Sequence, residues 1–205
     1  MSRKALTVML VASVVCLILA PLVASADATC DFRVGMRKLW EDHVSWTRMY
    51  IISAVAGLPD KATTAERLLA NQTDIGNAVK AFYGDAAGTK LTALLKSHIM
   101  LAGELIDAAK AGEAAKKDEI SKRWYANADE IATFLSSANP KQWPEAEMKK
   151  MMHEHLNLTT AEVVARLGKD WKADVAAYEK VHEQILGMAD ALSSGIVAQF
   201  PEKFK

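Results

Sequence analysis

Apolar side chains recur at steps of three and four residues along nearly the whole chain from residue 32 onward. This spacing gathers them on one face of an α-helix, whereas a strand would place them at every second position. We therefore expect an all-α fold, an antiparallel helical bundle of four long core helices plus one or two additional helices. The predicted helices cover residues 32–56, 63–84, 86–112, 116–136, 144–155 and 159–200.

Short breaks separate these segments. Residues 57–60, Gly-Leu-Pro-Asp, end the first predicted helix, and Gly84 and Gly112 end the second and third. Residues 156–158 are expected to interrupt the chain again, because residues 159–162, Thr-Thr-Ala-Glu, match a capping box that would open the last helix. No internal repeat is apparent in the sequence.

The amino terminus has the composition of a secretory signal. Arg3 and Lys4 precede an uncharged, mostly apolar stretch over residues 5–23, and residues 24–26 form an Ala-Ser-Ala cleavage motif. A basic start, an apolar middle and small residues at the cleavage site are the three parts of a signal peptide. We interpret residues 1–26 in this way.

Residues 27–205 would then form one helical-bundle domain, exported to the periplasm, the cell surface or the extracellular space. The alternative is an uncleaved membrane anchor over residues 5–24, since this stretch is nearly long enough to span a bilayer. A membrane partner is expected only in that case.

Charge and cysteine content give little indication of a partner. The chain has 25 basic and 25 acidic residues, and removal of the two basic residues of the signal leaves a net charge of −2. Without a basic excess we expect no nucleic-acid partner. Cys30 is the one cysteine that follows the signal, so it is either a free thiol or a bridge between two copies in a homo-oligomer.

The sequence carries none of the common catalytic or cofactor motifs. It contains no C-x-x-C, no G-x-x-x-x-G-K-[ST], no G-x-S-x-G and no H-E-x-x-H. One E-x-x-H match, at residues 179–182, lacks the second copy that a ferritin-like di-iron site requires. These absences favour a protein that is not an enzyme.

Polar side chains nevertheless interrupt the apolar faces of several predicted helices. His43, His98 and His182 each fall mid-helix within the apolar stripe of a different segment. Asp174 and Tyr178 precede His182 at steps of four, so these three share one helix face. Because an unpaired buried polar group costs about 1–3 kcal/mol, this set must be hydrogen-bonded or bind a ligand.

The functional interpretation of this polar set is a site for a metal ion or a small ligand. Imidazole and carboxylate donors suit zinc, iron or copper, and neighbouring polar groups would orient the rings. The candidate ligands are His43, His98, His182, Asp174 and His155, and the candidate orienting residues are Tyr178, Asn127, Gln72 and Asp42.

Two other interpretations remain open. The polar set could form a hydrogen-bonded network that fixes the register of the helices without any ligand, in a structural or protein-interaction module. A metalloenzyme is the third interpretation, and it would need an open coordination position.

A second cluster of soft ligands lies between residues 148 and 155. It consists of Met148, Met151, Met152, His153 and His155. Thioethers and imidazoles select copper, which would indicate a copper-handling protein. The alternative is an apolar face on a short helix, since methionine commonly fills gaps in cores.

The most distinctive stretch is residues 39–48, LWEDHVSWTR. Together with residues 74–77, 94–98, 127–131 and 199–204, it resembles a family of uncharacterised exported or membrane-associated prokaryotic helical-bundle proteins that share an L-W-x-D-H-x-x-W-T-R segment. The resemblance covers nearly the whole chain after the signal and implies a shared helical fold. It implies no activity and no catalytic residue.

Overall fold

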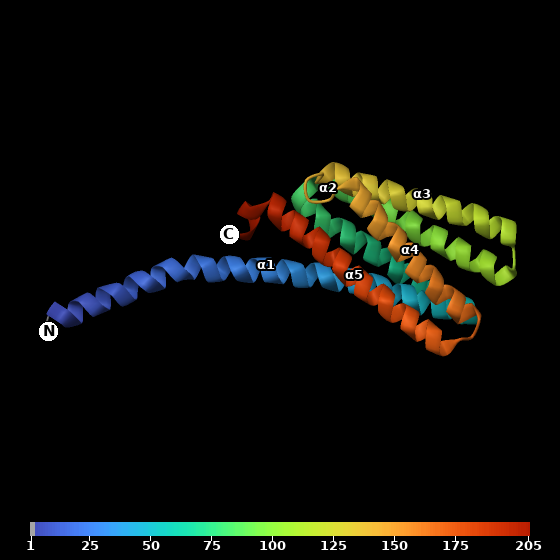
Figure 1. Cartoon of the computed structure of the whole chain (residues 1–205), viewed down its shortest axis with the longest axis horizontal. Coiled ribbons are helices and arrows are strands. Elements are labelled where there is room, and N and C mark those ends of the chain that lie inside the picture. Colours follow the sequence, from blue (N-terminus) through green and yellow to red (C-terminus); the bar gives the residue numbers. More distant parts are fainter. Residues whose placement is uncertain (1–2) are drawn as a thin grey trace.

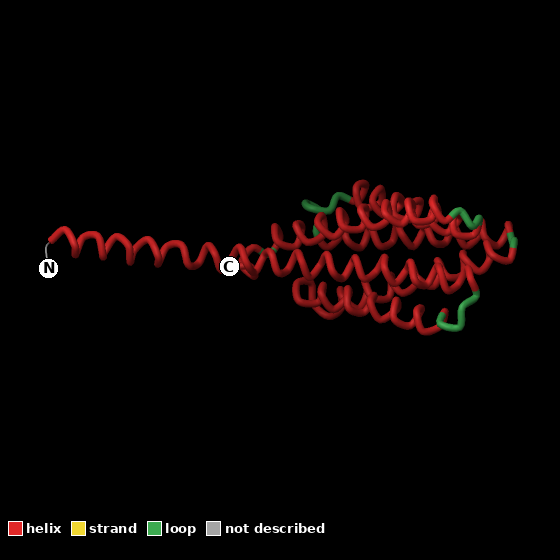
Figure 2. Tube along the Cα trace, turned by 90° about the horizontal axis from the view of Figure 1, so that it is seen from below, coloured by secondary structure: helices red, strands yellow, loops and turns green. Residues whose placement is uncertain are grey.

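The computed structural model describes the backbone of residues 3–205 and the side chains of residues 28–205. It consists of α1 (Arg3–Ala56), α2 (Lys61–Ala111), α3 (Ala114–Ala138), α4 (Glu145–Leu167), α5 (Trp171–Gln199) and the short 3-10 helix η1 (Pro201–Phe204). No strand occurs in this described backbone. The helices pack side by side with short loops near the two ends of the bundle (Figures 1 and 2), and the predicted all-α bundle is confirmed.

Helix α2 consists of two helical rods joined at Gly84. This residue has φ 84° and ψ 169°, outside the helical region, and glycine adopts such a positive φ without strain. Residues 61–83 and 85–111 consequently run antiparallel (Figure 1). The prediction that one helix ends at Gly84 and another follows it is confirmed.

The two rods of α2 touch through their backbones. A Cβ atom on Gly76 would lie 2.7 Å from the carbonyl oxygen of Gly88, and a Cβ atom on Gly88 would lie 2.5 Å from the carbonyl oxygen of Gly76. Both positions therefore require glycine, because any side chain would push the rods apart.

The predicted break at residues 156–158 is wrong, because α4 continues through it to Leu167. Thr159 does not cap a new helix: its Oγ1 donates a hydrogen bond of 2.9 Å to the carbonyl oxygen of His155, one turn back. Threonine can make this bond inside a helix, so a capping-box sequence alone does not mark a helix start.

The actual boundary lies at residues 168–170. Lys169 has φ 59° and turns the chain, and the side chain of Asp170 accepts a hydrogen bond of 3.0 Å from the backbone nitrogen of Ala173. This N-cap satisfies one of the free amides at the start of α5. Helix α5 consequently begins at Trp171.

The bundle is a set of three helical hairpins, which we number by chain order. The first hairpin is α1 with residues 61–83, the second is residues 85–111 with α3, and the third is α4 with α5 (Figure 1). The first helices of the three hairpins run in the same direction, from the Gly84 end of the bundle toward the opposite end.

The core divides into two clusters of buried side chains. The larger one includes Trp40, Leu95, Ile131 and Ile185. The smaller one, which we call the second core cluster, contains Tyr50, Ile51, Ala54, Leu68, Ile99 and Ile106.

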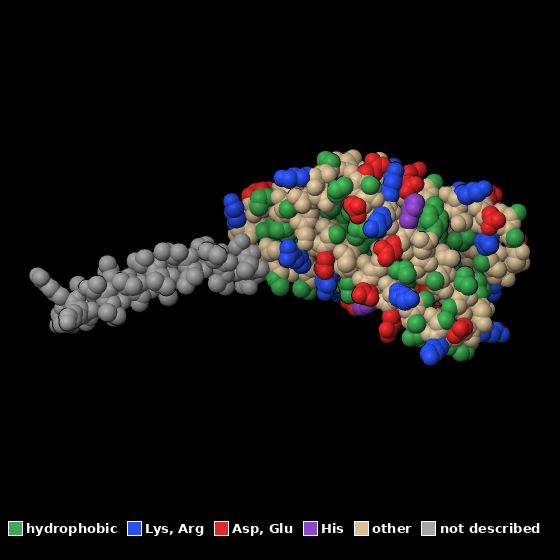
Figure 3. Space-filling model, in the orientation of Figure 1, with side chains coloured by type: hydrophobic (Ala, Val, Ile, Leu, Met, Phe, Trp, Pro, Cys, Tyr) green, Lys and Arg blue, Asp and Glu red, His purple; other side chains and the backbone are tan. Residues whose placement is uncertain are grey.

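Acidic and basic side chains are interspersed on the face of the bundle shown in Figure 3. Cys30 is exposed and unbridged within the chain. No helix in the part with described side chains has a segment long and apolar enough to cross a bilayer. The predictions of a signal peptide over residues 1–26 and of an alternative anchor over residues 5–24 concern side chains outside that part.

The contact between the rods of α2 predicts an unequal response to two glycine replacements. Gly76→Ala should destabilise the fold by about 1–3 kcal/mol, because the new methyl group overlaps backbone atoms of the neighbouring rod. Gly187→Ala is the matched control, since a Cβ atom there would meet nothing within 4 Å, and alanine should stabilise the helix by up to about 1 kcal/mol. Urea unfolding would measure both; an equal effect of the two replacements would contradict the packing.

Candidate functional site

Three histidines form a buried group inside the bundle. His43 in α1, His98 in α2 and His155 in α4 are only 4%, 3% and 5% exposed. The ring centroids of His43 and His155 are 5.8 Å apart, and His98 lies near enough for its charge to act on His43. We call these three residues the histidine layer.

Each histidine of the layer is hydrogen-bonded to a carboxamide on the second helix of its own hairpin. The sequence separation is 29 residues in all three cases. The pairs are His43 Nδ1 with Gln72 Oε1 at 3.2 Å, His98 Nδ1 with Asn127 Oδ1 at 2.9 Å, and His155 Nδ1 with Gln184 Oε1 at 3.2 Å. The sequence-based prediction included Gln72 and Asn127 but missed Gln184.

The three carboxamides are themselves held in one orientation. Their amide nitrogens donate to backbone carbonyls, which leaves each carboxamide oxygen facing its ring. These bonds join Gln72 Nε2 to Leu68 O at 2.8 Å, Asn127 Nδ2 to Leu94 O at 3.3 Å, and Gln184 Nε2 to Met151 O at 3.0 Å.

This orientation assigns the proton on each ring. A carboxamide oxygen can only accept, so Nδ1 of each histidine must donate and carry the proton. A neutral imidazole has one protonated nitrogen, so Nε2 of all three rings is left with a bare lone pair.

The rings of the layer are neutral at ordinary pH. Burial lowers the pKa of His43 to about 3, and the repulsion that protonated His155 and His98 rings would exert lowers it further. Burial also lowers the pKa of His98 to about 3 and that of His155 to about 4. Neutral imidazole is the form that binds metal ions.

The hydrogen bonds around the layer reveal an internal repeat that the sequence-based prediction missed. In every hairpin, the carbonyl four residues before the histidine accepts a bond from a side-chain amide of the second helix. In the first hairpin the donor is Asn71 Nδ2, which lies 3.0 Å from the oxygen of Leu39. The three hairpins thus use the same local geometry despite different neighbouring residues.

Polar atoms without partners gather at the layer. Four buried side-chain atoms in the described part of the chain have no hydrogen-bond partner, and three of them are Trp40 Nε1, His98 Nε2 and Trp124 Nε1. The Trp40 ring lies 5.7 Å from His43, and the Trp124 ring lies 5.3 Å from His98. Since such atoms are rare in native cores, their concentration here distinguishes the layer from the rest of the core.

The structure places Asp174 in a buried ion-pair network away from the rings. Arg48 donates two hydrogen bonds to the Asp174 carboxylate and one of 2.8 Å to Glu162. Arg166 Nη1 donates a further bond of 3.0 Å to Asp174 Oδ2. Burial raises the pKa of both carboxyl groups. The bonds from Arg48 and Arg166 outweigh this effect at Asp174, whose pKa lies below its ordinary value, but not at Glu162.

Three other predicted residues also have partners outside the layer. His182 Nε2 lies 3.1 Å from Glu41 Oε1 at the surface. The Tyr178 hydroxyl is 3.3 Å from Ser45 Oγ. The remaining contact joins Asp42 to Lys38 at 2.7 Å.

The predicted methionine and histidine cluster on α4 divides between core and surface. Met148 and Met152 are buried in the larger core cluster with His155 nearby on the helix. His153 instead pairs with Asp129 at 2.9 Å and is partly exposed. Within the described residues, no group of three or more His, Cys, Asp or Glu side chains stands ready to hold a metal ion.

Comparison with known proteins adds no further indication of function. No family model matches the chain, and no match is found among curated proteins or among solved structures.

The neutral rings predict a loss of stability in mild acid for the metal-free protein. Their folded pKa values lie below 6.5, so the unfolded chain takes up more protons as the pH falls from about 6 to 5. Each histidine then lowers the free energy of unfolding by about 1.4 kcal/mol per pH unit, and the three together lower it by about 4 kcal/mol per pH unit. Stability is complete above about pH 7.5, begins to fall as the pH approaches 6.5, and should decline steeply below that value. Urea midpoints measured from pH 8 to 5 test this, and His98→Gln should remove about a third of the slope; a flat profile would contradict the neutral layer.

The Arg48 network predicts a large effect of one arginine replacement. Arg48→Ala leaves two buried carboxylates with too few hydrogen-bond donors. The free energy of unfolding, measured with urea at pH 7.5, should fall by about 3–5 kcal/mol. Arg37→Ala is the matched control: this arginine also pairs with an aspartate, Asp190, but both side chains are 48% exposed. The control should leave stability nearly unchanged. Similar losses of stability in both variants would contradict the claim that the buried Arg48 network stabilises the fold more than an exposed ion pair does.

Proposed function

We propose that this protein is an exported helical bundle that binds a transition-metal ion at the histidine layer, through Nε2 of His43, His98 and His155. The observation that carries the proposal is the shared tautomer: an oriented carboxamide holds the proton on Nδ1 of each ring. Metal-binding histidines are commonly held in this way by a hydrogen bond on the nitrogen that faces away from the metal.

The donor set favours copper or zinc. Three neutral imidazoles supply no negative charge, so a cuprous ion would bring less buried charge than a divalent ion. Zinc also accepts three histidines when a water or an anion completes its coordination. His182 and Asp174 are left out of the proposed site, because Glu41 and the two arginines already engage them.

Metal binding on this proposal is accompanied by movement of the rings. The described residues contain no preassembled group of three ligands, so the imidazoles must turn toward a common point. Rotation about the Nδ1 hydrogen bonds would change the Nε2 positions while retaining the carboxamide contacts.

The proposed export depends on the amino-terminal sequence. Arg3 and Lys4, the apolar stretch over residues 5–23 and the Ala-Ser-Ala motif support a signal peptide. An exported site would meet metal ions outside the cytoplasm.

The test is titration of the metal-free full chain with cuprous and zinc ions in the presence of competing chelators. One ion should bind per chain. The double replacement His43→Gln with His155→Gln should weaken binding more than about 100-fold, and Gln184→Leu, which removes only an orienting bond, should weaken it about 10-fold.

His153→Gln is the matched control, because His153 lies on the same helix as His155 but pairs with Asp129 at the surface. It should bind as the natural chain does. Circular dichroism would establish that each variant is folded. Binding of neither ion, or equal affinity in the double variant, would overturn the proposal.

A purely structural role is the second candidate. Its specific support is that every Nδ1 in the layer already has a partner, so the three bonds can set helix register without a ligand. In that case the double variant would lose stability and the metal titrations would show no binding.

A further inference from the structure

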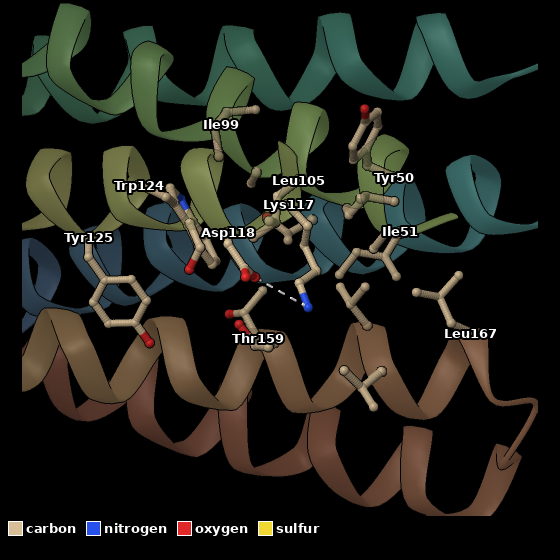
Figure 4. A pocket seen from close by; sticks show the side chains of 18 of the residues that line it. Tyr50, Ile51, Ile99, Leu105, Lys117, Asp118, Trp124, Tyr125, Thr159 and Leu167 are labelled. Atoms are coloured by element: carbon tan, nitrogen blue, oxygen red, sulfur yellow. Dashed lines mark ion pairs between the residues drawn. The ribbon is translucent and has the colours of Figure 1, made fainter. Parts of the chain in front are cut away.

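A cavity of about 330 Å³ lies between α1, both rods of α2, α3 and α4. Figure 4 shows Tyr50, Ile51, Ile99 and Leu167 on its walls, with Trp124 and Tyr125 at one side. Its volume is within the range of small-molecule sites.

The cavity adjoins the histidine layer. Thr47, Ala102 and Thr159 line it, and each lies four residues after a histidine of the layer, on the same helix. The first helices of the three hairpins run in the same direction, so these three residues form the next turn beyond the rings. Trp124 contacts both features, because it lines the cavity and its ring lies 5.3 Å from His98.

The second core cluster forms the wall of this cavity. Five of its six residues line the space, and the exception is Ala54. Native cores are close-packed, and voids larger than a water molecule are few. Here a whole cluster of aliphatic and aromatic side chains surrounds a space that these side chains do not fill.

Helix geometry explains why the space exists. Helices α3 and α4 diverge from the loop that joins them (Figure 1). The cavity is lined by the start of α3, through Lys117 and Ser121, and by the end of α4, through Val163 and Leu167, the parts of these helices farthest from that loop.

The opening carries both polar and apolar groups. Lys117 Nζ lies 3.5 Å from Asp118 Oδ1, and both side chains are well exposed. Figure 4 shows this pair beside Thr159. Val164, which also lines the cavity, is 61% exposed and contributes an apolar surface at the opening.

The interior offers few polar groups to a guest. The hydroxyls of Thr47 and Thr159 donate to the carbonyls of His43 and His155, at 2.7 and 2.9 Å, so they are committed to their own helices. Trp124 Nε1 also belongs to the lining and is buried without a hydrogen-bond partner among the described residues. An occupant therefore needs an apolar body that matches the walls.

We infer that this cavity binds one small, mostly apolar organic molecule with a single polar end, the body against Ile51, Ile99 and Leu167 and the polar end toward Lys117 and Asp118. An apolar cavity of roughly 150 Å³ holds benzene, so a space about twice as large accommodates two or three fused rings or a medium alkyl chain. The inference does not require a metal in the histidine layer.

The test uses 1-aminoanthracene, which has an apolar body and one polar group and fluoresces more strongly in apolar surroundings. Titrated with the metal-free full chain, it should bind saturably at one site per chain, and 1-octanol should displace it. Ala102→Phe and Ala109→Leu, which fill the cavity from two different turns of α2, should each weaken binding at least 10-fold.

Ala115→Leu is the matched control, since Ala115 lies exposed in the first turn of α3 and outside the cavity lining. It should bind as the natural chain does. If Ala102→Phe fails to fold by circular dichroism, Ala109→Leu decides the question. Absence of saturable binding, or equal binding by the folded cavity-filling variants, would overturn the inference.

Discussion

The hydrogen bond between a histidine Nδ1 and a carboxamide oxygen is the interaction on which the interior of this bundle depends. It occurs once in each hairpin, always across 29 residues, and so ties the first helix to the second at the same level three times. Because each carboxamide is anchored to a backbone carbonyl, the bond also fixes the tautomer of the ring. The same three hydrogen bonds therefore set both the register of the helices and the tautomer of the rings.

Around this layer, the two directions along the bundle differ in character. Toward Gly84 the interior is a packed core that includes Trp40, Met36 and Ile131. Toward the hairpin loops the core becomes the wall of the cavity, and the buried charges of Arg48, Glu162 and Asp174 hold α1, α4 and α5 together beside it. The histidine layer therefore lies between the close-packed part of the core and the cavity.

The fold was largely predictable from the sequence because apolar spacing and glycine breaks act locally. The α4–α5 boundary was not, since Thr159 and Glu162 serve the interior of a helix although they match a capping box. Gln184 was missed for a related reason. The steps of four from Asp174 to His182 follow one edge of α5, whereas Val181, Ile185 and Met188 define the buried face beside Gln184. The repeat was hidden because its members share geometry, through Gln72, Asn127 and Gln184, and little sequence.

The most direct test of the account is nitrogen-15 NMR of the histidine rings in the metal-free protein, with two-bond correlations that distinguish Nδ1 from Nε2. The account predicts that His43, His98 and His155 are neutral, with the proton on Nδ1 and a bare Nε2, and that they remain so as the pH falls from 8 to 6. A proton on Nε2 of these rings, or titration of any of the three near pH 6.5, would contradict it.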